Sequence, residues 1–585
     1  MKGIFSRIYS HLNVRRRIQF VILFFLMIIA SFSEVISLGA VLPFLSVLTS
    51  PEELFKSEFV KKFFDIVNVK KPMDLLFPIT LLFSVTVILS GIMRFLLLWF
   101  QTRLCYSIGA DFSFDIYRKT LYQKYSVHIS RNSSEVISGI SNKANSIIYA
   151  ALIPILSSLS SALMLLMMFG VLLYINPLVT CATILGFSLI YTIIIKFANS
   201  KLSYYSQLNS IKSNQVVKAI QEGLGGIRDV LLDGTQNTYC EIYKSADFPL
   251  RRAQANIVII GGSPRFGIES LGIVLIAILA YSLASQDGGI GTAIPTLGAF
   301  AMGAQRMLPI LQQAYSNWTI IKSSESFLND TLDLLDQPLP DYALNENYNN
   351  PIIFKNEIVL KNIHFRYSPA APFVLKEINV KIKKGEKIGF IGTTGSGKST
   401  LLDIFMGLIS PSIGQLYIDR TEINDENCRT WQAHIAHVPQ AIFLSDSTIA
   451  ENIAFGVPYE LIDFERVRES AKLAQMAEVI ESWEGQYLTN VGERGVRLSG
   501  GQRQRIGIAR ALYKKADVIV FDEATSALDN ETEREVMESI KGLSNDLTIV
   551  IVAHRLSTLK DCDKIIELKN GIVHKVGSYE NLIKP

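Results

Sequence analysis

The feature that most constrains this chain is the stretch Gly-Thr-Thr-Gly-Ser-Gly-Lys-Ser at residues 392–399, with Thr400 after it. The apolar run 387–391 before it predicts a buried strand, and residues 401–405 predict the start of a helix. A phosphate-binding P-loop requires this context, because glycines let backbone N–H groups crowd around phosphates and the helix N-terminus adds a favourable partial charge. The alternative, a chance Gly/Ser turn, would need all eight motif positions to be filled by accident. The sequence therefore predicts a nucleotide site.

Each residue type in this loop has an expected role. The Lys398 ammonium would reach the β- and γ-phosphates of ATP, and the Ser399 hydroxyl would ligate Mg²⁺. The residues that we expect to bind the nucleotide here are Gly392, Thr393, Thr394, Gly395, Ser396, Gly397, Lys398, Ser399 and Thr400.

Two further stretches complete the predicted ATPase. The apolar run 518–521 ends in two acids, of which Asp522 would hold the Mg²⁺ shell and Glu523 would polarise the attacking water. Residues 498–502, Leu-Ser-Gly-Gly-Gln, open a predicted helix whose glycines and dipole form a second anion site. Two phosphate-binding helix starts in one chain are expected if each ATP is held between two chains.

Composition divides the chain into two parts. Hydrophobic residues make up 49% of it, charged residues only 19%, and the mean hydropathy is +0.28; a soluble protein has roughly 25% charged residues. The apolar residues concentrate before about residue 325. Six apolar segments there are long enough to cross about 30 Å of hydrocarbon. They lie near residues 18–48, 74–104, 143–175, 178–198, 256–285 and 290–322.

The predicted fold is therefore multidomain. We expect an all-α polytopic membrane domain with six transmembrane helices over residues 1–330, a linker over 331–355 and an α/β P-loop nucleotide-binding domain over 356–585. Apolar residues at helical spacing predict an amphipathic helix near 51–70, either at the outer membrane surface or packed on the protein. Long polar stretches suggest that the spans extend into the cytoplasm and join through short transverse helices near 133–141 and 225–234.

The charges of the chain limit its location and partners. A net charge of +4 is too small to indicate nucleic-acid binding. Residues 1–17 contain no acid, so a mitochondrial transit peptide is one explanation of their arginines and lysine. The positive-inside rule explains them more simply and places the N-terminus in the cytoplasm. The five cysteines are scattered and suggest neither a disulfide framework nor a metal site.

These motifs, in this order, resemble those of the ABC transporter family along the whole chain. The resemblance implies that Tyr367 stacks on adenine and that Gln440 touches Mg²⁺ or the attacking water. It implies that Ser499, Gly500, Gly501 and Gln502 close on the γ-phosphate of the partner's ATP. Residues Ser526–Asp529 resemble the D-loop, and His554 resembles the switch histidine. The order of domains is similar to that of exporter half-transporters, and this resemblance implies that a second chain completes the transporter. The simplest interpretation is a homodimer with two active ATP sites.

Three arginines lie where charge in a membrane is expensive: Arg94, Arg265 and Arg306. Each costs about 2.5–3.5 kcal/mol at the membrane centre, so we expect them to bind an anionic substrate in a wet cavity. Internal pairing is the alternative, because Glu269 follows Arg265 by four residues and Glu34 lies in the first span. Snorkelling to the membrane surface is a second alternative, mainly for Arg265.

Three segments resemble one exporter branch, the flippases for lipid-linked oligosaccharides of bacterial protein N-glycosylation. They are residues 34–44, the segment from Pro264 to Glu269, and the segment from Arg306 to Pro309. That resemblance implies ATP-driven flipping of a pyrophosphate-linked glycolipid in the bacterial inner membrane. A general lipid or multidrug exporter is the main alternative. Less favoured are a peptide or bacteriocin exporter and an ATP-gated channel.

Overall fold

The computed structural model describes residues 2–49, 76–130, 144–175, 177–284, 289–340, 343, 352–523, 530–541, 546–553 and 556–583. The chain forms two compact units. The first contains residues 1–123 and 130–339, and the second contains residues 124–129 and 340–585. The predicted helix near 51–70, the predicted joint at 133–141, Ser526–Asp529 and His554 lie outside the described residues.

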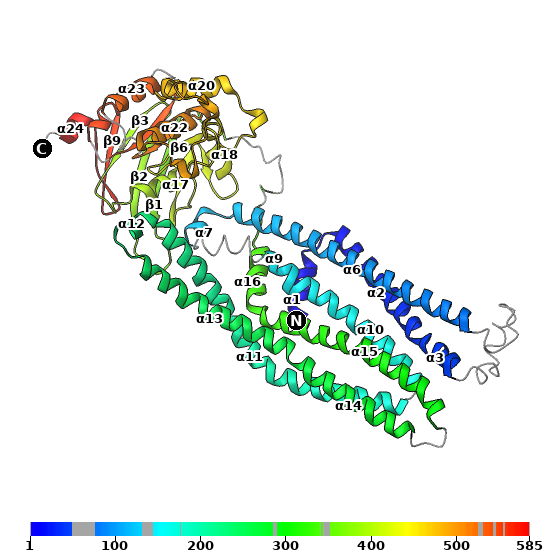
Figure 1. Cartoon of the computed structure of the whole chain (residues 1–585). Coiled ribbons are helices and arrows are strands. Elements are labelled where there is room, and N and C mark those ends of the chain that lie inside the picture. The colour runs from blue at the N-terminus through cyan, green and yellow to red at the C-terminus, as the bar shows by residue number, and fades with distance from the viewer. Residues whose placement is uncertain are drawn as a thin grey trace. The chain divides into compact units, whose positions relative to one another are not determined.

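The first unit is helical, and its long helices can be followed from blue to green in Figure 1. Its elements are α1 Lys2–Ser10, α2 Val14–Gly39, α3 Val41–Thr49, α6 Leu76–Leu121, α9 Ala144–Ser146, the π-helical turn η3 Ile147–Leu152, α10 Ile153–Ile175, α11 Pro177–Gly225, α12 Ile227–Leu232, α13 Gln236–Gly262, α14 Pro264–Ala284, α15 Gly289–Ser323 and α16 Glu325–Leu335.

Several of these helices are longer than a membrane is thick. Helix α6 has 46 residues and α11 has 49, which at about 1.5 Å per residue exceeds a hydrocarbon layer of about 30 Å. This agrees with spans that extend beyond the membrane. Helix α12 lies where the sequence predicts the second transverse helix.

The predicted count of six spans is not confirmed. Five helical segments of the described residues are long and apolar enough to cross a membrane: Val14–Leu48, Leu76–Leu121, Ile147–Tyr174, Ile184–Gly225 and Gln236–Val274. The sixth predicted span coincides with helix α15, which is not among them. A protein with several such helices is an integral membrane protein.

The core of the first unit lies where α2 and α6 pack along each other. Leu23 and Met27 of α2 and Ile108 of α6 are completely buried in it. At Gly109, a Cβ would lie 2.2 Å from Cδ1 of Ile148, so glycine is what lets η3 approach α6 this closely. Helix α1 packs on α16, where Arg7 pairs with two aspartates.

The second unit contains two sheets (Figure 1). The antiparallel sheet has the order β2-β1-β4-β5, and the other has the order β10-β9-β3-β8-β7-β6. The strands are β1 Glu357–Phe365, β2 Leu375–Lys383, β3 Lys387–Ile391, β4 Ile413–Ile418, β5 Thr421–Ile423, β6 Ile435–Val438, β7 Val518–Asp522, β8 Thr548–Val552, β9 Lys564–Lys569 and β10 Ile572–Gly577.

The second unit also contains helices. They are α7 Tyr125–Ser130, α17 Lys398–Phe405, α18 Cys428–Ala433, α19 Ile449–Ile453, α20 Phe464–Leu473, α21 Ala477–Glu481, α22 Gly500–Tyr513, α23 Asn530–Lys541 and α24 Tyr579–Ile583, with short turns η5 Tyr459–Leu461, η6 Gln486–Leu488, η7 Glu493–Gly495 and η8 Leu556–Leu559.

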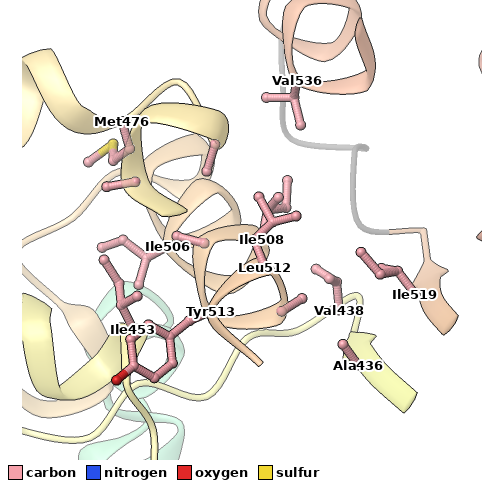
Figure 2. Close-up of a cluster of buried hydrophobic side chains, with 14 of the residues drawn as sticks. Ala436, Val438, Ile453, Met476, Ile506, Ile508, Leu512, Tyr513, Ile519 and Val536 are labelled. Atoms are coloured by element: carbon pink, nitrogen blue, oxygen red, sulfur yellow. The ribbon is translucent and has the colours of Figure 1, made fainter. Parts of the chain in front are cut away.

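A hydrophobic cluster joins α22 to the strands beside it (Figure 2). Ile506, Ile508 and Leu512 of α22 are buried with Val438 of β6 and Ile519 of β7. Strands β6, β7, β8 and β3 are nearly continuous apolar runs, as expected for parallel strands that are covered on both faces. Residues of β6, β7 and β8 share this cluster with α22, and this packing positions the ends of the strands.

Candidate functional site

Polar residues of the second unit gather at the carboxyl ends of its parallel strands. Strands β3, β8, β7 and β6 are hydrogen-bonded neighbours in this order, and all pairs among them are parallel. The P-loop follows β3, Asp522 ends β7, and Gln440 lies two residues beyond β6. Because carboxyl ends of parallel strands share one edge, the topology brings together motifs that lie far apart in the sequence. Binding at this edge is the rule for open α/β sheets.

The P-loop backbone passes close to neighbouring chain segments. A Cβ on Gly392 would lie 2.3 Å from the carbonyl oxygen of Leu568, so no larger residue fits. Gly395 and Gly397 have φ angles of 81° and 99°, a region that favours glycine. Gly397 is the N-cap of α17. The loop therefore has the curvature that turns backbone N–H groups towards an anion at a helix N-terminus.

Two side chains of the loop have hydrogen-bonding capacity suited to phosphate. The Lys398 ammonium donates to the carbonyl oxygens of Gly392 at 2.8 Å and Thr393 at 3.2 Å. The Ser396 hydroxyl is buried, and the described part of the chain offers it no hydrogen-bond partner. A buried polar group without a partner is costly, so the loop fits a phosphate group that would accept from both.

Acidic groups gather beside the loop and raise one another's pKa values. Burial, together with the charge of Glu523, raises the pKa of Asp522, although Lys398 acts in the opposite direction. Burial and the charge of Asp522 raise the pKa of Asp403 to about 6. Carboxylates that repel one another are stabilised by a bound cation. Oxygen atoms of Asp522, Ser399 and Gln440 are the ligand type that Mg²⁺ prefers, so the residues present fit that ion.

Glu523 is held in an unusual backbone conformation. Its φ angle is 51°, which costs a non-glycine residue about 1–3 kcal/mol. Its N–H donates to the carbonyl oxygen of Val552 in β8 at 3.0 Å, and its carboxylate accepts from the Gln440 side chain at 2.8 Å. The strand neighbour and Gln440 thus fix the carboxylate that the sequence predicts to polarise water. The sequence does not predict this hydrogen bond.

Tyr367 lies after β1, at the antiparallel sheet. Its hydroxyl is 3.0 Å from the Thr400 hydroxyl, and its ring contacts Phe365 edge-on with the centroids 5.0 Å apart. The side chain is 56% exposed, so a ring face is accessible for stacking on a base. The bond to Thr400 ties the predicted adenine-stacking residue to the P-loop helix, a link that spacing alone could not reveal.

The predicted signature residues behave differently. Ser499 is the N-cap of α22 and forms a capping box with Gln502: its N–H donates to the Gln502 side chain at 2.8 Å, and its hydroxyl accepts from the Gln502 N–H at 3.2 Å. These bonds stabilise the helix start and do not involve the P-loop of the same chain. Gly500 and Gly501 follow in the first turn. Among the described residues, no hydrogen bond joins Ser499 or Gln502 to the P-loop.

In the first unit, all three predicted substrate arginines contact carboxylates. Arg306 Nη1 lies 3.0 Å and Arg94 Nε 3.5 Å from the two oxygens of Glu34. Arg265 Nε lies 3.5 Å from Glu269 on the same helix. The structure thus shows the pairs that the sequence offers as the alternative to a free cationic cavity. Glu34 is 1% exposed and faces two arginines, so this cluster keeps an excess positive charge.

The comparison with known proteins follows the same division into two units. The family profile described as "ABC transporter transmembrane region" matches residues 20–302, and that described as "ABC transporter" matches residues 375–526. Together the two matches cover most of the chain. The chain belongs to the ABC transporter family. The predicted order of a helical membrane domain and an α/β ATP-binding domain is confirmed.

Two relatives within this family have names that describe lipid flipping and toxin translocation. The chain is 30% identical over 387 residues to the "ATP-dependent lipid A-core flippase" of Cupriavidus metallidurans, covering 66% of this chain and 64% of the relative. It is 38% identical over 308 residues to the "Leukotoxin translocation ATP-binding protein LktB" of a Pasteurella haemolytica-like species, covering 52% of this chain and 42% of the relative. The matches thus span less than two thirds of these relatives.

The fold resembles that of a bacterial Atm1-family ABC exporter solved with ATP bound. The TM-score is 0.80 at 21% identity, over 98% of this chain and 97% of the other. This ABC transporter thus shares the fold of that exporter, with a membrane domain followed by an ATP-binding domain.

Proposed function

We propose that this ABC transporter hydrolyses ATP to move a lipid with an anionic headgroup, of the lipid-linked oligosaccharide type, across the bacterial inner membrane. The observation that carries the proposal is the cluster of Arg94, Arg306 and Glu34, which joins three helices of the membrane unit and has two cations for one carboxylate. Excess positive charge inside a membrane is expensive and is retained mainly for function.

A lipid as the cargo is supported by the surface beside this cluster. An apolar groove of about 380 Å³ runs between α2 and α6, lined by residues that include Ile29, Phe32, Leu89 and Met93. Met93 of the groove and Arg94 of the cluster are successive residues of α6, so the groove and the cluster lie within one turn of the same helix. An amphipathic lipid needs an apolar and a cationic surface at such a short separation. The relatives named lipid A-core flippases are consistent with lipid movement.

On the ATPase side, Lys398 and the P-loop would hold the phosphates, Ser399, Asp522 and Gln440 would hold Mg²⁺, and Glu523 would position water. His554 would contact the γ-phosphate. Bound Mg²⁺ would neutralise charge on the phosphates. Because Ser499 and Gln502 bond to each other and, among the described residues, not to the P-loop, we propose that a second identical chain supplies Ser499 to Gln502 to the nucleotide site.

The test is ATP hydrolysis by the purified protein in proteoliposomes. We expect stimulation by a polyprenyl-pyrophosphate oligosaccharide and none by the same oligosaccharide on a neutral polyprenol. Arg306→Ala should abolish the stimulation, whereas Arg251→Ala, at an exposed arginine of α13 paired with Asp247, should retain it. Stimulation by hydrophobic drugs or neutral lipids alone would contradict the proposal in favour of a general exporter.

A further inference from the structure

The carboxylate of Glu34 has an unusual position for a residue in a predicted membrane span. Its side chain is 1% exposed, and it contacts groups from three helices. Arg306 of α15 is 3.0 Å from Oε1, while Arg94 and the Ser90 hydroxyl, both of α6, contact Oε2. A buried carboxylate with these partners is fully compensated.

Arg306 has more hydrogen-bond partners within the protein than Arg94 and is less exposed. Arg306 also donates to the Ser37 hydroxyl at 3.2 Å, and its side chain is only 22% exposed. Arg94 approaches Glu34 through Nε, at 3.5 Å, and is 51% exposed. A guanidinium has five N–H donors in a planar fork that fits carboxylate and phosphate oxygens equally well. Arg94 therefore presents donors to a ligand while still paired with Glu34.

We infer that Glu34 competes with the cargo for Arg94 and Arg306, and that it thereby selects lipids with more than one negative charge on the headgroup. This inference rests on the proposed function. If a phosphodiester replaced Glu34 beside the arginines, one negative charge would replace another, and binding would gain no electrostatic free energy. A pyrophosphate brings more charge and neutralises both arginines, so it displaces the carboxylate.

The protein can accommodate the displaced carboxylate. Ser90 already donates to Glu34, and Ser37 lies one turn further along α2, where its hydroxyl becomes available once Arg306 moves. Ser31, one turn earlier, has a buried hydroxyl for which the described residues provide no partner. A buried carboxylate that accepts hydrogen bonds from hydroxyl groups keeps part of its stabilisation. The Glu34 carboxylate therefore keeps hydrogen-bond partners after the arginines have bound the cargo.

The experiment compares Glu34→Gln with the wild type in nanodiscs, using labelled polyprenyl pyrophosphate and labelled phosphatidylglycerol as probes. We expect the preference of the wild type for the pyrophosphate lipid to fall about tenfold in Glu34→Gln, a typical size for energetic coupling between groups. The fall should come from tighter phosphatidylglycerol binding. Asp111→Asn is the matched control, because it removes an ion pair with Arg16 between the same two helices away from the cluster. It should leave the preference unchanged.

The outcomes separate this inference from the proposed function. If the wild type binds and responds to the pyrophosphate lipid but Glu34→Gln shows the same preference, or binds both lipids more weakly, the inference is wrong and the proposed function stands. If neither lipid stimulates the wild-type ATPase, the proposed function is wrong. A gain of anionic-lipid binding in Glu34→Gln would then still support competition by Glu34, and the absence of that gain would overturn it.

Discussion

The nucleotide site and the Glu34 cluster differ in how their charges are compensated. At the nucleotide edge, Asp522 at the end of β7 repels both Glu523 and Asp403 of α17, and a bound cation would reduce this repulsion. In the membrane unit, Glu34 already compensates one of the two positive charges of Arg94 and Arg306. The difference follows from the surroundings. An edge open to water tolerates uncompensated charge, whereas an apolar bundle requires partners within the protein.

The largest effect is expected at Glu523, the carboxylate that is predicted to polarise the attacking water. Glu523→Gln should lower ATP hydrolysis by about 10²–10⁴-fold, the usual contribution of a positioned proton acceptor. ATP binding should persist, because the P-loop is unchanged and glutamine can keep a hydrogen bond with Gln440. Steady-state hydrolysis and labelled-nucleotide binding measure the two effects. Hydrolysis at the wild-type rate would show that another group positions the water.

In the membrane cluster, the two arginines should differ in their contribution to stability. Arg306→Ala should destabilise the protein by about 3 kcal/mol, since it leaves a buried carboxylate with a weaker partner. Arg94→Ala should cost about 1 kcal/mol or less, because that pair is longer and half exposed. Thermal unfolding in detergent compares the two. Equal losses would contradict the asymmetry of the cluster.

The nucleotide site depends on backbone geometry, whereas the membrane cluster depends on side chains. Gly392→Ala should cost about 1–3 kcal/mol through overpacking and weaken ATP binding, because its Cβ would meet the Leu568 carbonyl oxygen at 2.3 Å. Gly91→Ala, close to Arg94 in α6, meets nothing within 4 Å and should be neutral or slightly stabilising. Nucleotide binding and unfolding temperatures test both. Normal ATP binding by Gly392→Ala would show that the loop can relax.

An effect that appears only at acidic pH concerns His437 in β6, next to the nucleotide edge. Burial lowers the pKa of His437 to about 4. The stability contributed by the neutral ring is therefore fully present above the unfolded pKa of about 6.5 and is lost as pH falls towards 4. His437→Gln should flatten the fall in unfolding temperature over this window and leave the value at pH 8 nearly unchanged. An identical pH profile in both proteins would show that the ring is accessible to water.

Much of the ATP-binding unit could be predicted from local sequence. The strand, glycine turn and helix around Lys398 and the apolar strand before Asp522 are short patterns whose conformations depend on neighbouring residues. The long helices follow from their apolar content, but the count of six spans is not confirmed. The hydrogen bonds Gln440–Glu523 and Tyr367–Thr400 join residues 83 and 33 positions apart, so no local pattern encodes them.

The sequence by itself determined which chemical groups this protein has: a P-loop, paired acids, a second anion-binding helix start and three arginines in an apolar half. Tertiary structure decided which groups from different elements meet. The parallel order β3-β8-β7-β6 brings the P-loop, Asp522 and Gln440 to one edge, and the packing of α2, α6 and α15 joins Glu34 to Arg94 and Arg306. The physical reason is that helix spacing fixes which face a residue shares within its own helix, whereas the partner across an interface depends on how whole helices pack.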